Sequence, residues 1–253
     1  MTDVRLCTFN VRLDTPSDAP ADWEHRRAGV IETLERIDPD IICLQEPFFH
    51  QLTDIEAGLP AYDWFGEGRF GGNEGEFCPI GWRRSRLTLE DSTLRWLSET
   101  PTETGTIGWD GAFPRIVTIT RLNVDDRSLA VWNTHFDHEG ATARLEAAGL
   151  LREWLDGRTG SILAGDFNCD PGSPPFTELA ARLTYAREAA RETLGPTGTF
   201  NDFTGTPGEA IDHVFVTPDI QIERCETVVF TDDDPLPSDH FPVVVDLTIP
   251  DEA

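Results

Sequence analysis

Hydrophobic and polar residues follow one another along the chain with the spacings typical of strands and helices. Alternating or continuous apolar runs predict strands at residues 4–11, 41–45, 77–82, 87–94, 115–122, 129–134, 162–165, 211–217, 220–230 and 241–249. Apolar residues three to four positions apart predict helices at 23–37, 48–57, 141–155 and 175–183. Asp22 is a candidate N-cap for the helix at 23–37, and Asp38 and Pro39 follow its end.

Strands and helices are mixed from one end of the chain to the other, and strands in the middle follow each other across short turns. This order favours an α/β fold with partly antiparallel sheets over a parallel doubly wound sheet. The sequence contains no internal repeat and no linker-like stretch. We therefore expect residues 1–253 to form a single domain.

The charge balance is strongly acidic. Asp and Glu number 46 against 20 basic residues, all of them Arg, which gives a net charge of −26. Such a chain would repel itself at low salt, whereas in molar salt the Debye length falls to ~3 Å. We therefore expect a salt-adapted surface, typical of a protein from an extreme halophile. In molar salt the net sign also says little about nucleic-acid binding, because counterion release is weak there.

The cysteines and the hydropathy indicate a cytoplasmic location. The chain has five cysteines and no C-x-x-C pair, and Cys7 and Cys43 lie inside apolar runs typical of buried thiols. The N-terminal residues lack the pattern of a signal peptide, and no apolar run reaches the length of a membrane span. We expect neither membrane contact nor a protein partner.

Two segments are interpreted as loops. Gly66, Gly68 and Gly71 match G-x-G-x-x-G, but more glycine follows instead of a helix, so a dinucleotide fingerprint is rejected. We expect a mobile loop there, with Arg69 as a phosphate contact. The acidic stretch TDDDP at 231–235 is interpreted as a solvated turn.

Polar side chains gather where the predicted strands begin or end. The residues at these positions are Asn10, Glu46, His135, Asp166, Asn168, Asp212, Asp239 and His240. A sheet fixes the backbone at such points, so the side chains can face one cleft. Taken singly, a strand-end Asp is more often a turn residue than a functional one. As a set, these oxygen-rich groups suit Mg²⁺ or Mn²⁺ rather than structural zinc.

The same residues occur in short words that resemble the ordered motifs of the endonuclease/exonuclease/phosphatase superfamily. The words are FN at 9–10, LQE at 44–46, NTHFDH at 133–138, GDFN at 165–168, IDH at 211–213 and SDHFPV at 238–243. The resemblance covers nearly the whole chain. Within the superfamily, the chain resembles a compact prokaryotic subgroup. It implies a four-layer α/β/β/α sandwich, in which two mainly antiparallel or mixed sheets pack face to face with helices outside.

The resemblance also implies roles for the residues in these words. Glu46 would be the principal Mg²⁺ ligand, flanked by Asn10 and Asp239. Asp166 and Asn168 would orient the attacking water and the phosphate, His135 would contact a phosphate oxygen, and His240 would pair with Asp212. The sequence leaves open whether Asp166 or His240 activates the water.

Three arginines are predicted to bind the substrate. Arg12 stands where related abasic-site endonucleases place an acidic residue, which favours phosphate binding over a second metal. Arg115 closes the word FPR, and Arg69 lies in the glycine-rich loop. A further departure is GWR at 81–83, which stands where an aromatic-aromatic-basic word is expected from the resemblance and is predicted to open the pocket.

Three functions remain as hypotheses. The first is a metal-dependent phosphodiesterase or nuclease that cleaves a P–O bond by in-line attack of water, with nucleic acid as a candidate partner. The second is a phosphomonoesterase acting on a small phosphorylated metabolite, sugar or lipid headgroup. The third, disfavoured by the intact set of acids, amides and histidines, is a binding protein without catalysis.

Overall fold

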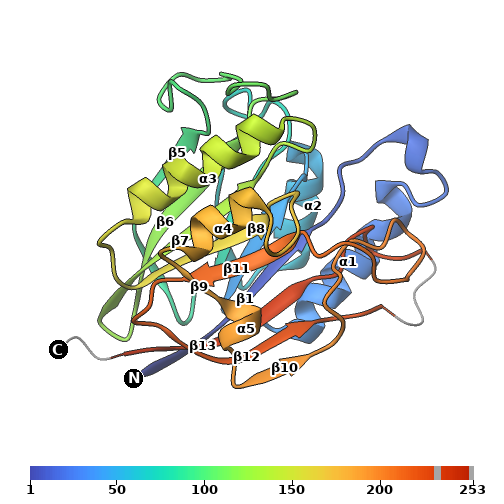
Figure 1. The fold of residues 1–253 in the computed structure, drawn as a ribbon. Coiled ribbons are helices and arrows are strands. Elements are labelled where there is room, and N and C mark those ends of the chain that lie inside the picture. The colour runs from blue at the N-terminus through green and yellow to red at the C-terminus, as the bar shows by residue number, and fades with distance from the viewer. Residues whose placement is uncertain (231–234, 251–253) are drawn as a thin grey trace.

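The structure, a computed structural model, describes residues 1–230 and 235–250. Two mixed sheets form its centre (Figure 1). Sheet 1 has the strand order β10 (Glu192–Leu194), β12 (Gln221–Thr227), β13 (Val243–Ile249), β1 (Thr2–Asn10), β2 (Ile41–Gln45), β4 (Ile80–Arg83), β3 (Tyr62–Phe65). Sheet 2 has the order β5 (Thr88–Trp96), β6 (Ile116–Val124), β7 (Arg127–His135), β8 (Ser161–Asp166), β11 (Asp212–Val216), β9 (Thr184–Tyr185).

Three apolar layers hold the fold together. One joins the inner faces of the two sheets and contains Leu6, Val131 and Val245. A second packs sheet 2 against α3 (Ala141–Leu155) and α4 (Pro174–Ala180), which lie side by side in Figure 1. A third packs sheet 1 against α1 (Trp23–Ile37) and α2 (Phe49–Gly58). The predicted four-layer sandwich is therefore confirmed.

Helix α1 shows why the sequence pattern was informative. The Asp22 side chain accepts a hydrogen bond from the backbone of His25, and the helix ends at Ile37, where Asp38 turns into the left-handed region at φ 51°. Val30 and Leu34 on the inner face are almost fully buried. The predicted bounds of α1, β2 and α3 are confirmed.

Other predicted bounds were wrong by a few residues. The strand predicted at 77–82 begins only at Ile80, directly after Pro79, which has no N–H for a ladder bond. The helix predicted at 175–183 ends at Ala180, and the strand predicted at 220–230 ends at Thr227. The prediction missed β3, β9, β10, the short helix α5 (Ala186–Ala189) and the 3-10 turn η1 (Pro16–Asp18).

Gly81 does not open the functional pocket. It pairs with Trp64 across β3 and β4, and a Cβ atom at Gly81 would lie 2.7 Å from the Trp64 ring. The glycine therefore makes room for a tryptophan. Neither Gly81 nor Trp64 lines the cavity at the ends of the central strands, so the prediction that GWR opens the pocket was wrong.

Residues 231–234 of the predicted acidic turn lie outside the described residues. All five cysteines are buried and free, as predicted for Cys7 and Cys43. No helix among residues 1–230 and 235–250 is long and apolar enough to cross a membrane.

Candidate active site

The strand pairing brings the polar words to one edge of the sandwich. Asn10 ends β1, and Glu46 directly follows the parallel neighbour β2. On sheet 2, His135 and Asp166 are paired at the ends of the parallel strands β7 and β8, and Asp212 opens β11 opposite Asp166. Residues that are far apart in sequence therefore share one site because their strands end at the same edge.

A cavity of about 580 Å³ lies at this edge. The predicted residues that line it are Arg12, Glu46, Arg69, Arg115, His135, Asp166, Asn168, Asp239 and His240. Asn10 and Asp212 lie behind this lining, each in hydrogen-bond contact with a lining residue. The structure thus brings together every residue in the predicted site.

A second hollow of about 770 Å³ opens near the start of β1 and has a different character. Its arginines Arg5, Arg83 and Arg86 each have a carboxylate partner in Asp246, Asp38 and Asp40. None of the polar words identified in the sequence lines it. The residues predicted to carry the chemistry therefore line the cavity of about 580 Å³ and not this second hollow.

Asn10 connects the two sheets through their carboxylates. Its side-chain nitrogen donates to Glu46 Oε1 at 2.9 Å and to Asp166 Oδ2 at 3.0 Å, while its oxygen accepts from the backbone of Arg12 at 3.0 Å. The other oxygen of Glu46 accepts from the backbone of Leu13 at 2.9 Å. The amide holds two negative groups close together at the floor of the cavity.

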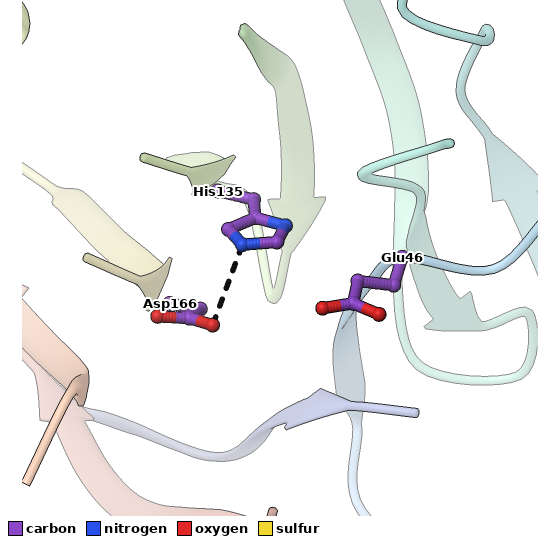
Figure 2. Close-up of side chains that lie close together, drawn as sticks. All are labelled: Glu46, His135 and Asp166. Atoms are coloured by element: carbon purple, nitrogen blue, oxygen red, sulfur yellow. Dashed lines mark ion pairs between the residues drawn. The ribbon is translucent and has the colours of Figure 1, made fainter. Parts of the chain in front are cut away.

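Glu46, His135 and Asp166 offer ligand atoms that all lie within 4.8 Å of one another (Figure 2). His135 Nε2 is 3.5 Å from Asp166 Oδ2, and Glu46 faces both from across the cavity. Asp166, Asp212 and His240 form a second group of this kind. Carboxylate oxygens so closely spaced fit a hard divalent cation, because each would otherwise repel its neighbour.

His240 is held by an aspartate. Its Nδ1 lies 2.8 Å from Asp212 Oδ2, and its Nε2 lies 3.9 Å from Asp166 Oδ2. Burial lowers the pKa of His240, but the charges of Asp212 and Asp166 outweigh burial and raise this pKa to about 10. The imidazole is therefore cationic at neutral pH.

The pKa values of Asp166 and His135 both shift in the direction that favours the neutral side chain. Burial, with the nearby charge of Asp212, raises the pKa of Asp166 to about 7. Burial, with the charge of Arg115, lowers the pKa of His135 well below its usual value, so this imidazole is neutral. A carboxylate that titrates near neutral pH is suited to accept a proton.

Four residues that line the cavity have backbones in the left-handed region. Arg12, Glu46, Asn168 and Asp202 have φ values of 57°, 75°, 46° and 51°, which non-glycine residues seldom adopt. The backbone of Asn168 donates to Asp166 Oδ1 at 2.9 Å, and its side-chain nitrogen donates to the carbonyl of Phe136 at 2.9 Å. Such strain is concentrated at functional sites, where the surrounding structure holds it in place.

Arg69 and Arg115 share one buried carboxylate on the cavity wall. Arg69 Nη2 lies 2.8 Å and Arg115 Nη1 lies 3.7 Å from the carboxylate of Glu76. Arg115 Nε is also 3.5 Å from Asp137. Both arginines are at most 8% exposed, and Arg69 Nε, Arg69 Nη1 and Arg115 Nε have no hydrogen-bond acceptor among residues 1–230 and 235–250. The carboxylates of this wall therefore leave several guanidinium N–H donors without a hydrogen bond.

Arg12 lies on the other side of the cavity. It forms two hydrogen bonds to Asp18, at 2.8 and 3.2 Å, and its Nη1 is 3.6 Å from Asp239. Desolvation lowers the pKa of Arg12 less than these carboxylates raise it, so the net shift is upward. The guanidinium is therefore fixed beside the predicted metal residue Asp239.

Sequence reasoning missed Glu76 and Phe200, which also line the cavity. Burial, with the charge of Glu46, raises the pKa of Glu76 to about 7. The Phe200 ring packs edge-on against His240, with ring centroids 5.1 Å apart. The sequence pattern that could have indicated Glu76 is its position directly before an apolar run. Because glutamates are common in this chain, that pattern was too weak to identify Glu76 as a site residue.

Comparisons with known proteins agree with this fold. A sequence profile described as the Endonuclease/Exonuclease/phosphatase family matches residues 7–240. A solved endonuclease/exonuclease/phosphatase from Bacteroides vulgatus is 34% identical with a TM-score of 0.94, over 99% of this chain and 100% of that one. A mannosyl-6-phosphatase from Bacteroides thetaiotaomicron is 31% identical with a TM-score of 0.90, over 97% of this chain and 100% of that one.

A curated relative, Nocturnin of Drosophila melanogaster, is 23% identical over 98% of this chain and 47% of that protein. The chain spans 60% or less of the length of the curated relatives it matches.

Proposed function

The chain belongs to the endonuclease/exonuclease/phosphatase family, and from this premise we propose that it hydrolyses a phosphoester with Mg²⁺ or Mn²⁺ as cofactor. Members of this family are hydrolases that act on phosphoesters. The chain keeps the buried acids, amides and histidines that such a reaction requires, which supports an enzyme over a binding protein.

The donor set fits a divalent cation. Glu46, with Asn10 and Asp239 beside it, would hold the ion, and the short distance from Glu46 to Asp166 and His135 supports this placement. A cation bound there would polarise a phosphate oxygen and offset the negative charge of the transition state. The positive ion would then offset the repulsion between these closely spaced carboxylates.

Asp166 is the favoured proton acceptor. It lies at the centre of the cluster, contacts Asn10 and Asn168, and has a pKa raised to about 7. A water beside it would attack phosphorus and give its proton to the carboxylate, while the ester P–O bond opposite breaks. His240 is cationic, so its role is to stabilise the phosphate oxygens rather than to take the proton.

The arrangement of charge around the cavity is the observation that favours a small phosphomonoester. Arg12, Arg69 and Arg115, which line the cavity, are buried or half-buried, whereas the carboxylates of Asp202 and Glu209, which also line it, are exposed. A monoester phosphate carries up to two charges and three acceptor oxygens that guanidinium groups bind well. A polynucleotide would bring further phosphates against the exposed carboxylates, which disfavours it.

The similarity to a mannosyl-6-phosphatase over nearly the full length of both chains supports the same substrate class. A phosphorylated sugar or other small metabolite is therefore placed ahead of the phosphodiester or nucleic acid that the sequence alone placed first. The salt-adapted surface, the cytoplasmic location and the single domain remain part of this proposal.

A substrate panel tests the proposal. Initial rates are measured with Mg²⁺ or Mn²⁺, in low salt and in molar KCl, on hexose phosphates, glycerol phosphate, a phosphodiester, single-stranded and duplex DNA, and RNA. We expect turnover of monoesters, its loss with EDTA, and higher activity in molar KCl. Turnover of diesters alone would reject the substrate class, and no turnover of any phosphoester would reject the proposed function.

A further inference from the structure

Arg26 in α1 is a fully buried arginine with an unusual set of partners. Its residue is 1% exposed, and no carboxylate among residues 1–230 and 235–250 lies within ion-pair distance of it. Burial lowers its pKa, which shows the cost of placing this cation away from water. A buried charge of this kind is expected to serve a purpose that an apolar side chain could not.

Every hydrogen bond of this guanidinium goes to a backbone carbonyl. Nη1 donates to Val11 and to Pro237, each at 2.8 Å, and Nη2 donates to Arg12 at 3.2 Å and Leu13 at 3.5 Å. Nε donates to Ala21 at 2.6 Å. The planar fork of donors is thus used to connect two chain segments that are more than 200 residues apart in sequence.

Each of the two segments lies next to a residue of the candidate metal site. Val11 directly follows Asn10, and Pro237 lies two residues before Asp239. A second link acts at the same place, because the Ser238 hydroxyl donates to the carbonyl of Asn10 at 2.6 Å. Hydrogen bonds from the side chains of Arg26 and Ser238 therefore link the backbone beside Asn10 to the backbone beside Asp239, through residues that do not line the cavity.

The guanidinium itself has little freedom to move. It lies between the rings of Trp23 and Phe203, 5.7 and 5.5 Å from their centroids. Gly29, one turn further along α1, allows Pro237 to approach so closely that a Cβ atom would lie 3.2 Å from the proline ring. The helix thus holds both the cation and the segment before Asp239 in one position.

We propose that Arg26 is a positioning residue for the divalent cation: by binding the backbone of residues 11–13 and of Pro237, it sets the separation of Asn10 and Asp239. The inference rests on the proposed function, since it assumes that these residues hold a metal. Arg26 touches neither substrate nor metal, and its effect reaches the ion through the two loops. Residues that orient metal ligands from behind typically affect metal affinity 10- to 100-fold.

Calorimetric titration of EDTA-stripped protein with Mn²⁺ alone tests this without any substrate. Arg26→Ala is expected to weaken Mn²⁺ binding about 10- to 100-fold, and guanidinium ion at millimolar concentration is expected to restore part of it, whereas ammonium ion is not. Arg26→Lys keeps the charge and loses the fork, so we expect a loss of about threefold or more. This second variant decides the matter if Arg26→Ala does not fold.

Val30→Ala is the matched control. Val30 lies one turn further along the same helix and is fully buried in the apolar core. Its side chain has no polar group that could bind the backbone of either loop. It should lower stability and leave Mn²⁺ affinity within about twofold of wild type. Wild-type affinity in Arg26→Lys, or an equal loss in Val30→Ala, would overturn the proposal.

The outcome is separable from that of the substrate panel. Wild-type protein that binds Mn²⁺ and hydrolyses nothing would reject the proposed function while the effect of Arg26 on binding still stands. Active wild-type protein with unchanged Mn²⁺ affinity in both Arg26 variants would reject the role of Arg26 alone.

Discussion

Nδ1 of His240 lies 2.8 Å from Oδ2 of Asp212, and both side chains are buried. Asp212 is itself paired across the sheet with Asp166, so one carboxylate orients the imidazole while the next faces the cavity. The pair fixes the ring of His240 with Nε2 directed toward Asp166. The relationship places a cation beside the group that we propose as the proton acceptor.

Replacing Asp212 by Asn should lower kcat about 10²- to 10⁴-fold with little change in fold. The amide is similar in shape but no longer holds the imidazolium by charge, so His240 loses its protonated state and its fixed orientation. Steady-state rates and a circular dichroism spectrum check this. Asp63→Asn at the surface is the control and should leave kcat unchanged.

The pKa of His240 predicts a pH dependence of stability. Because it is raised from 6.5 to about 10, proton binding stabilises the folded protein fully below pH 6.5, and this contribution is lost as the pH rises toward 10. Relative to His240→Gln, the metal-free wild type should therefore lose free energy of unfolding across this range. Urea denaturation at several pH values measures the difference, and a constant difference would contradict the assignment.

Gly165 is predicted to be important for stability, because the absence of a side chain lets β7 and β8 approach each other. Its φ is 149°, and a Cβ atom would lie 2.0 Å from the carbonyl oxygen of Thr134. Gly165→Ala should cost about 3 kcal/mol of unfolding free energy and lower activity, since these strands carry His135 and Asp166. Gly149→Ala in α3, with open space around it, should instead add up to about 1 kcal/mol.

The arginine wall predicts an effect on substrate binding. Arg115→Lys keeps a charge but loses the planar fork, so KM for a phosphomonoester should rise about tenfold with a smaller change in kcat. The dependence of rate on substrate concentration measures both constants. Arg121→Lys on the exposed face of β6 is the control, because this arginine is not among the residues that line the cavity. An unchanged KM in Arg115→Lys would remove this residue from the binding site.

The sequence was most informative where local chemistry alone decides structure. Asp22 as an N-cap predicted the start of α1, and Asp38 with Pro39 predicted its end. The short motifs at strand ends identified Glu46, Asp166 and His240 as site candidates, because a strand end can be recognised where an apolar run meets a polar residue. Their convergence depended on the family resemblance and on parallel pairing, which no single word contains.

The sequence was least informative where contacts between distant segments decide structure. Strands β9 and β10 are two and three residues long and depend on pairing with β11 and β12, so they have no period of their own. Glu76 becomes notable only when Arg69 and Arg115 meet it from separate loops. The role that we propose for Arg26 depends on the contacts of its side chain with residues 11–13 and Pro237, which are far apart in sequence.

The central claim is that the buried cluster around Asp166 is the catalytic centre of a metal-dependent phosphoesterase. The most direct measurement is the initial rate of Asp166→Asn on the best substrate of the panel, at saturating Mg²⁺. The account predicts a loss of about 10³-fold or more in kcat, with the variant folded and the EDTA-treated wild type equally inactive. A rate within tenfold of wild type would contradict it.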